Sequence, residues 1–171
     1  MKLKKFSFKT VTSTNDIAIK KIKSGYSSGI IIAKKQTRGR GRYGNKWIYL
    51  KDNLFMSIFF LLGEKIGLKK LTTISCKLVK KSLSKFLKKK ITIKQPNDLL
   101  IDKKKICGIL QETIFHENKK FVIIGIGINI HRCPEIPGYP TAYLNLFTKK
   151  KLTSFKIYNE ITNNFEFYLK N

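Results

Sequence analysis

The sequence predicts an α/β domain, of the α+β kind, in which helices pack against a mixed β-sheet. The chain has 171 residues, the size of one domain, and 42% of them are hydrophobic, enough to bury a core. Segments with strand character outnumber those with helical periodicity. Short hairpin connections occur beside longer ones, which is typical of a sheet with both antiparallel and parallel strands. There is no repeat or linker, so we expect one domain over residues 1–171.

The first predicted helix covers residues 14–24. Ser13 or Thr14 can cap its N-terminus, Asp16 lies in its first turn, and Gly25 follows its end.

Two apolar runs, at residues 29–33 and 54–62, predict buried strands. Between them, residues 34–47 are polar and rich in glycine and predict a loop. Residues 68–89 predict an amphipathic helix, because apolar residues recur every three to five positions and lysines fill the other face.

The second half of the chain predicts four more strands and a closing helix. The strands are expected at residues 91–94, 98–102, 105–115 and 121–130, and the second and third should pair through a tight turn. The next segment, residues 131–147, holds three prolines and predicts a loop. The helix is expected at residues 153–169, with an apolar stripe on one face. The members of that stripe are Phe155, Tyr158, Ile161, Phe165 and Tyr168.

Several classes of protein are excluded by composition. The longest apolar run, Leu54–Gly63, has about ten residues, too few to span a bilayer. The basic N-terminus is not followed by an apolar stretch of about 7–15 residues, as a secretory signal would be. Cys76, Cys107 and Cys133 are odd in number and widely spaced, which argues against a disulfide framework. We therefore expect a cytoplasmic protein without a membrane anchor.

The charge balance is strongly basic, with 36 Lys and Arg against 10 Asp and Glu, a net charge of +26. Such an excess favours anionic partners such as nucleic acid. Only four of the basic residues are arginine, and the lysines are spread over the whole chain. A genome-wide drift towards Lys, Ile and Asn codons would give the same pattern, so charge alone leaves both causes open.

The loop from Gln36 to Trp47 (QTRGRGRYGNKW) is the most informative segment. Arg38, Arg40 and Arg42 fall within five residues of a chain that uses lysine nearly everywhere else. The planar guanidinium group binds phosphate or carboxylate through two hydrogen bonds, which lysine cannot do. The loop glycines let backbone N–H groups approach such a ligand, and the tryptophan can stack on a base or cap a pocket.

The glycines of this loop also have the spacing Gly39-x-Gly41-x-x-Gly44, which matches the dinucleotide fingerprint. The loop does not directly follow a strand or open a helix, so a Rossmann site is rejected. A solvated basic turn and an arginine–glycine segment that binds RNA remain open.

Residues 121–130 (FVIIGIGINI) alternate so that isoleucines face one way, whereas Gly125, Gly127 and Asn129 face the other. Two glycines on one face weaken a strand and indicate that something packs against bare backbone. A flat ligand ring beside the asparagine amide and a closely crossing helix account for this equally well.

Residues 94–112 hold a second candidate group. Asn97 and Asp98 follow a proline and can be simple turn residues. Lys105 belongs to a lysine triplet. Strict alternation along the strand places its side chain on the other face from Gly108 and Leu110.

These motifs, in this order, resemble the catalytic domain of biotin–protein ligases. The matching segments are Ser13-Thr14-Asn15, Gly39-Arg-Gly-Arg-Tyr-Gly44 with Trp47, Lys94–Asp98 with Lys104–Leu110, and Gly125–Asn129. Lipoate ligases and lipoyl transferases are weaker matches of the same fold. The resemblance implies the biotin/lipoate ligase catalytic fold, which is similar to class II aminoacyl-tRNA synthetases. No N-terminal winged helix and no C-terminal SH3-like domain are expected.

The resemblance also implies a reaction. ATP would activate biotin as biotinyl-5'-AMP, and biotin would pass to a lysine of the biotin carboxyl carrier protein of acetyl-CoA carboxylase. Mg²⁺ would be carried with ATP, near Asp98, and we expect no metal held by a side-chain cluster and no specific DNA binding. The alternatives are a lipoyl or octanoyl ligase or transferase and a basic nucleic-acid-binding module.

Residue roles follow from the resemblance alone. Arg42 would hold the adenylate, Lys105 would stabilise charge at the α-phosphate, and Asp98 would orient the incoming lysine. Trp47 would stack on adenine, with Asn97 near the phosphates. An outward turn of Lys105 at the mouth of its strand, caused by a bulge, would remove the conflict with alternation. The remaining implied site residues are Ser13, Thr14, Asn15, Gln36, Gly39, Arg40, Gly108, Leu110, Gly125, Gly127 and Asn129. Gln95 departs from the family pattern, which has tryptophan there, and buried Cys107 is expected to be inert.

Overall fold

The computed structural model describes residues 2–63 and 66–171, and its central feature is a seven-stranded sheet in the order β1-β2-β3-β7-β6-β5-β4. The pair β1–β2 is parallel and the other neighbours are antiparallel, so the predicted mixed sheet is confirmed. The strands are β1 (Lys5–Val11), β2 (Ser28–Gln36), β3 (Leu54–Leu61), β4 (Thr92–Lys94), β5 (Asp98–Ile101), β6 (Lys104–His116) and β7 (Lys119–Ile128).

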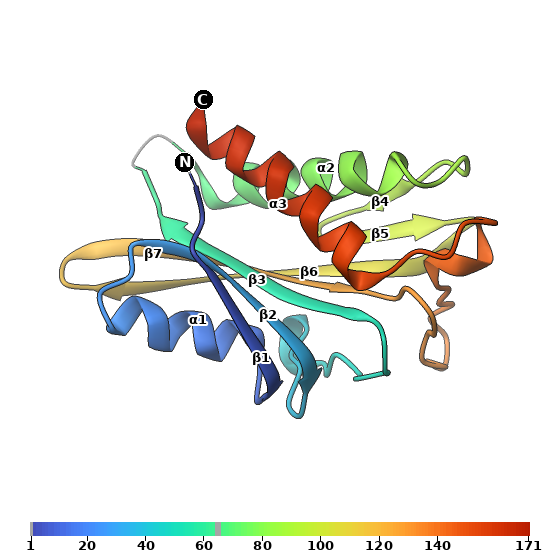
Figure 1. Ribbon diagram of the computed structural model, residues 1–171, viewed down its shortest axis with the longest axis horizontal. Coiled ribbons are helices and arrows are strands. Elements are labelled where there is room, and N and C mark those ends of the chain that lie inside the picture. The colour runs from blue at the N-terminus through green and yellow to red at the C-terminus, as the bar shows by residue number, and fades with distance from the viewer. Residues whose placement is uncertain (1, 64–65) are drawn as a thin grey trace.

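Three helices cover the two faces of the sheet unequally (Figure 1). Helices α2 (Leu68–Ser84) and α3 (Ser154–Lys170) lie side by side on one face. Helix α1 (Thr14–Lys23) lies on the opposite face. The short turn η1 (Arg42–Gly44) is on the α1 side, and η2 (Leu144–Leu146) follows β7. Because α1 is short, part of the sheet face around β6 and β7 is left for other groups.

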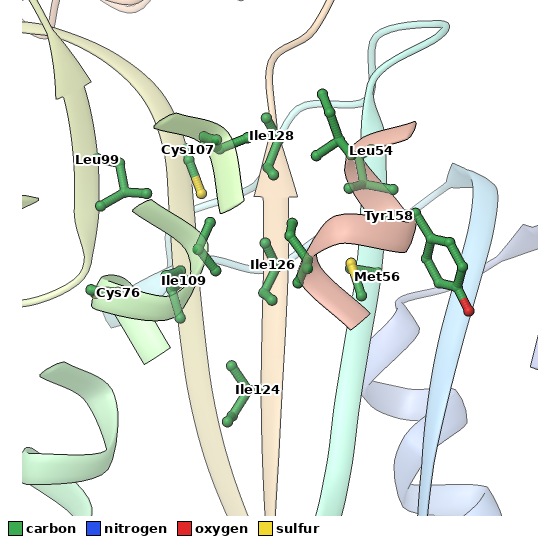
Figure 2. Packing of buried hydrophobic residues seen from close by; sticks show 14 of the residues in the cluster. Leu54, Met56, Cys76, Leu99, Cys107, Ile109, Ile124, Ile126, Ile128 and Tyr158 are labelled. Carbon is green, nitrogen blue, oxygen red and sulfur yellow. The ribbon is translucent and has the colours of Figure 1, made fainter. Parts of the chain in front are cut away.

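The larger core lies between the sheet and the pair α2–α3. Ile124, Ile126 and Ile128 of β7 all point towards this layer, as the alternation predicted (Figure 2). A smaller cluster, including Ala18, Ile22 and Phe59, joins α1 to the other face. Each face of β7 therefore has its own environment, apolar on one side and glycine-rich on the other.

Most predicted elements are confirmed, and α1 begins with one of its two candidate caps. Ser13 is that cap, since its side chain accepts a hydrogen bond from the N–H of Asn15. The second helix was predicted to run to residue 89 but ends at Ser84. The chain needs residues 85–91 to descend from the helix layer to the edge strand β4, and Leu87 and Ile91 are buried along that path.

Two further predictions are corrected. The strand β1 was not predicted, although Phe6 and Phe8 alternate with polar residues and pack against the α1 cluster. The stripe of α3 was expected to include Phe155, which is 62% exposed, whereas Ile157 is fully buried. Among the described residues, no helix is long and apolar enough to cross a membrane.

Candidate active site

A cavity of about 650 Å³ opens on the α1 face of the sheet, beyond the N-terminal end of α1. It is bounded by the start of α1, the loop after β2, the turn before β5, and the strands β6 and β7. Every predicted site residue except Gly39 lines this cavity. Gly39 is buried behind it, where its carbonyl accepts a hydrogen bond from the N–H of Trp47 at 2.9 Å. The structure thus brings together segments that lie far apart in the sequence.

Trp47 forms one wall of the cavity by lying on bare strand backbone. A Cβ atom added to Gly127 would come within 2.6 Å of its Cζ2, and one added to Gly108 within 2.7 Å of its Cζ3. Gly125 is covered instead by Asn15 at the start of α1, whose Oδ1 would be 2.5 Å from an added Cβ. Of the two alternatives predicted for the glycine face, the flat ring over Gly127 is the indole of Trp47 and not a ligand. The closely crossing helix is found at Gly125.

Buried polar side chains line the end of the cavity at α1. The Gln36 Oε1 atom accepts hydrogen bonds from the backbone N–H and the hydroxyl of Thr14, at 2.7 and 3.0 Å. The fully buried Ser57 hydroxyl lies 2.7 Å from the Thr14 hydroxyl and 2.5 Å from the Asn15 Oδ1 atom. Such a hydrogen-bonded network fixes the orientation of its donors and acceptors.

Arg40 joins the loop to two secondary-structure elements through acidic partners. Its guanidinium group is paired with Asp16 of α1 and lies 3.1 Å from Glu112 of β6. Glu112 also accepts a hydrogen bond from Asn15 at 2.5 Å. Burial is the largest single influence on the pKa of Arg40 and lowers it. The hydrogen bonds and charges of the two carboxylates together outweigh burial, so the pKa is raised. The arginine thus anchors the loop as well as lining the cavity.

Arg42 stands in a different environment from Arg40. Its guanidinium group donates a hydrogen bond to the exposed Tyr43 hydroxyl at 2.7 Å and lies 4.7 Å from that ring. Among the described residues it forms no ion pair with a carboxylate. It is therefore available to an anionic ligand in the cavity.

Lys105 and Asp98 form an ion pair at the opposite end, with Lys105 Nζ 2.9 Å from Asp98 Oδ1. Both side chains are largely buried, at 20% and 14% exposure. The other carboxylate oxygen of Asp98 accepts a hydrogen bond from the Tyr139 hydroxyl at 2.6 Å. Burial, then this bond, raises the pKa of Tyr139, so its phenol remains a donor at neutral pH.

A β-bulge explains how Lys105 reaches the cavity. Leu99 pairs with Cys107, but the next residue of β5 pairs with Lys105, so Ile106 is the extra residue on β6. Ile106 and Cys107 are both buried in the core, and the side chain of Lys105 comes to the same face as Gly108. The predicted bulge is confirmed, and it removes the conflict with strict alternation.

The two asparagines of the candidate set are used in the framework of the cavity. The Asn97 side chain donates to the Ile109 carbonyl at 2.7 Å, and the Asn129 side chain donates to the Ala142 carbonyl at 3.2 Å. Both nevertheless line the cavity, as does Leu110.

Several lining residues were not predicted, above all Tyr139 and Thr141 in the segment expected to be a plain loop. Lys46, Lys94, Gln95 and Ile136 also line the cavity. No sequence pattern identified the tyrosine, because its contact with Asp98 spans 41 residues. The lining holds five Lys or Arg residues and one Asp, so the cavity favours a polyanion.

Neither a reactive thiol nor a protein-built metal site is found at this cavity in the described part of the chain. Burial raises the pKa of the Cys107 thiol well above its usual range and that of Cys76 to about 11, so both stay protonated. Residues 2–63 and 66–171 contain no cluster of three His, Cys, Asp or Glu that could hold a metal ion. Asp98, the carboxylate among the described lining residues, is already paired with Lys105.

Several solved structures with this architecture are biotin protein ligases. The biotin protein ligase of Leishmania major in complex with biotinyl-5-AMP matches with a TM-score of 0.83 and 26% identity, covering 94% of this chain and 72% of that one. The ligase of Aquifex aeolicus in complex with biotin and ATP matches with a TM-score of 0.79 and 28% identity, covering 98% and 70%. The fold is therefore that of the biotin protein ligase catalytic domain.

Sequence comparison gives the family directly. The model of the biotin/lipoate A/B protein ligase family matches residues 7–129, and the chain belongs to this family. It is 38% identical over 110 residues to the bifunctional ligase/repressor BirA of Bacillus subtilis, covering 61% of this chain and 33% of that protein. It is 34% identical over 126 residues to BirA of Escherichia coli, covering 70% and 38%. The chain thus spans about a third of the length of these relatives.

Proposed function

We propose that this chain is an ATP-dependent ligase that activates biotin as biotinyl-5'-AMP and transfers biotin to a lysine of a carrier protein. The observation that carries this proposal is the single cavity in which the arginine loop, the glycine strand and the Asp98–Lys105 pair meet. Two related ligases were solved with biotinyl-5-AMP and with biotin and ATP, and their folds match this one over nearly the whole chain.

In the first step, the biotin carboxylate attacks the α-phosphate of ATP and pyrophosphate leaves. Two anions must approach each other, so fixed positive charge has to surround the phosphate. Lys105 and Arg42, which both line the cavity, supply it, and Trp47 provides a flat surface for adenine. Mg²⁺ would be carried by ATP as part of the substrate, because Asp98 is the only carboxylate among the described lining residues and one carboxylate does not make a metal site.

In the second step, the carrier lysine attacks the acyl carbonyl of the adenylate, its proton is lost, and AMP leaves. Asp98, which lines the cavity, would orient that amine. We propose the biotin carboxyl carrier protein of acetyl-CoA carboxylase as the partner. A relative from Paracoccus denitrificans, 28% identical over 127 residues, is named biotin–[acetyl-CoA-carboxylase] ligase.

The polar end of the cavity favours biotin over lipoate or octanoate, which the family description also admits. The ureido group of biotin is a flat, polar head that needs oriented donors and acceptors. Buried Thr14 and Asn15 at the start of α1, with Gln36 at the end of β2, provide them. A simple acyl chain offers no partner for the donor and acceptor positions that the bonds among these groups leave free, which costs binding free energy.

The test is pyrophosphate release from MgATP with biotin, lipoate or octanoate supplied separately, followed by labelling of a biotin carrier domain. We expect release with biotin alone and labelling of the carrier lysine. Release with lipoate or octanoate instead would establish the acyl-ligase alternative. No release with any acid would contradict the proposal, and a salt-dependent nucleic-acid titration would then test the basic-module hypothesis.

A further inference from the structure

Tyr139 lies next to the Asp98–Lys105 pair, in a segment without helix or strand structure. Its hydroxyl group donates to Asp98 Oδ2 at 2.6 Å, while Lys105 Nζ lies 2.9 Å from Oδ1. The carboxylate is therefore held from both sides, by a neutral donor and by a cation. Only the cation can also reach a ligand phosphate as a charged partner.

The same segment also fixes the backbone of Lys105. The Lys105 N–H donates to the Pro140 carbonyl, and the Ala142 N–H donates to the Lys105 carbonyl, both at 2.9 Å. These bonds form a parallel bridge between Lys105 and Thr141. The segment that follows the tyrosine is thus tied to the backbone of Lys105.

The ring of Tyr139 also lies close to a second cation, the ammonium group of Lys94. The Nζ atom of Lys94 lies 4.2 Å from the ring centroid, and that of Lys105 lies 5.4 Å from it. A cation over an aromatic face is attracted by the electron density of the ring. Two lysines therefore lie beside one tyrosine at the Asp98–Lys105 end of the cavity.

We propose that Tyr139 is a positioning residue that holds Asp98 in place so that Lys105 can exchange this carboxylate for the α-phosphate of ATP. The proposal rests on the proposed function. When Lys105 turns towards phosphate, Asp98 loses its cationic partner, and the hydroxyl bond keeps it paired and oriented. Without that bond, Lys105 is the remaining partner of the carboxylate among the described residues, so Asp98 competes with ATP for the lysine.

The variant Tyr139→Phe removes the hydroxyl and keeps the ring. We expect the KM for ATP to rise and the rate of biotin-dependent pyrophosphate exchange to fall, each by about tenfold, as for one hydrogen bond to a charged group. The KM for biotin should stay unchanged, because the α1 end of the cavity is untouched. Tyr143→Phe is the matched control, since Tyr143 is on the same segment and does not line the cavity.

A double-mutant cycle separates positioning from mere folding. If Tyr139 acts through Asp98, then adding Tyr139→Phe to Asp98→Asn should change the ATP KM by less than about twofold. An equal loss in both backgrounds would overturn the proposal, because it would show a structural role. Wild-type kinetics in the single variant would also overturn it.

Binding of ATP gives a readout that does not need catalysis. The chain has one tryptophan, and the Trp47 ring centroid lies 5.5 Å from Lys105 Nζ, so its fluorescence can report nucleotide binding. If the wild type binds ATP but forms no biotinyl adenylate, the proposed function fails while weaker ATP binding by Tyr139→Phe still supports the positioning role. Equal ATP affinity of the two proteins, or no binding by either, would overturn that role.

Discussion

The indole ring of Trp47 lies on the bare backbone of Gly127, 80 residues further along the chain. An added Cβ at Gly127 would be 2.6 Å from Cζ2 and 2.7 Å from Nε1 of the ring, far inside van der Waals contact. Gly108 on the neighbouring strand makes a similar seat. The glycines of β6 and β7 therefore set the depth at which the tryptophan wall stands in the cavity.

Gly127→Ala is expected to displace Trp47 and to weaken ATP and adenylate binding by at least about tenfold. The emission of the single tryptophan should shift to longer wavelength as the ring moves towards water, which fluorescence spectroscopy measures directly. Gly63→Ala is the control, because nothing lies within 4 Å of an added Cβ there. An unshifted spectrum together with unchanged ATP affinity would show that the close contact of Trp47 with Gly127 is not needed.

Arg42→Ala is expected to release biotinyl-AMP from the protein about tenfold or more faster, because a guanidinium group without a carboxylate partner among the described residues is lost from the cavity. Rapid filtration with labelled biotin measures the retained adenylate. Arg38→Ala, an exposed arginine of the same loop that does not line the cavity, should retain it normally. Equal retention by both variants would remove Arg42 from the adenylate site.

Lys105→Ala is expected to slow adenylate formation by about a hundredfold or more, because the charge that stabilises the α-phosphate transition state is lost. Pyrophosphate exchange measures this step separately from transfer to the carrier. Lys104→Ala changes an exposed neighbour on the same strand and should keep the wild-type rate. Full adenylation by Lys105→Ala would reject the role assigned to this lysine.

Glu112→Gln is expected to raise the KM for biotin severalfold, because the charged partner that ties Arg40 to β6 is removed while the hydrogen bond from Asn15 can persist. The free energy of unfolding should fall by less than about 1 kcal/mol, since the Arg40 and Glu112 side chains are about a third exposed and solvent screens their attraction. Steady-state kinetics and urea unfolding measure the two effects. Glu117→Gln, at the exposed β6–β7 turn, should alter neither, and equal kinetics of the two variants would refute the role of Glu112.

Local signals made much of the fold predictable. The cap at Ser13, the alternation of β7 and the hairpin β5–β6 each depend on neighbouring residues, and all three were predicted. The bulge near Lys105 was also predictable, because strict alternation would have turned this lysine towards the core face of its strand. The strand β1 was missed although Phe6 and Phe8 alternate with polar residues, whereas its parallel pairing with β2 across α1 has no local signal.

By itself, the sequence determined the class of sheet through its periodicity, and its resemblance to biotin–protein ligases implied the family and about half of the residues that line the cavity. Only the tertiary structure decided what those residues contact. Arg40 meets Glu112, Tyr139 meets Asp98, and Trp47 covers Gly127, across separations that no local pattern encodes. The physical reason is that strand order and register bring these partners together, and both are fixed by burying the whole core at once.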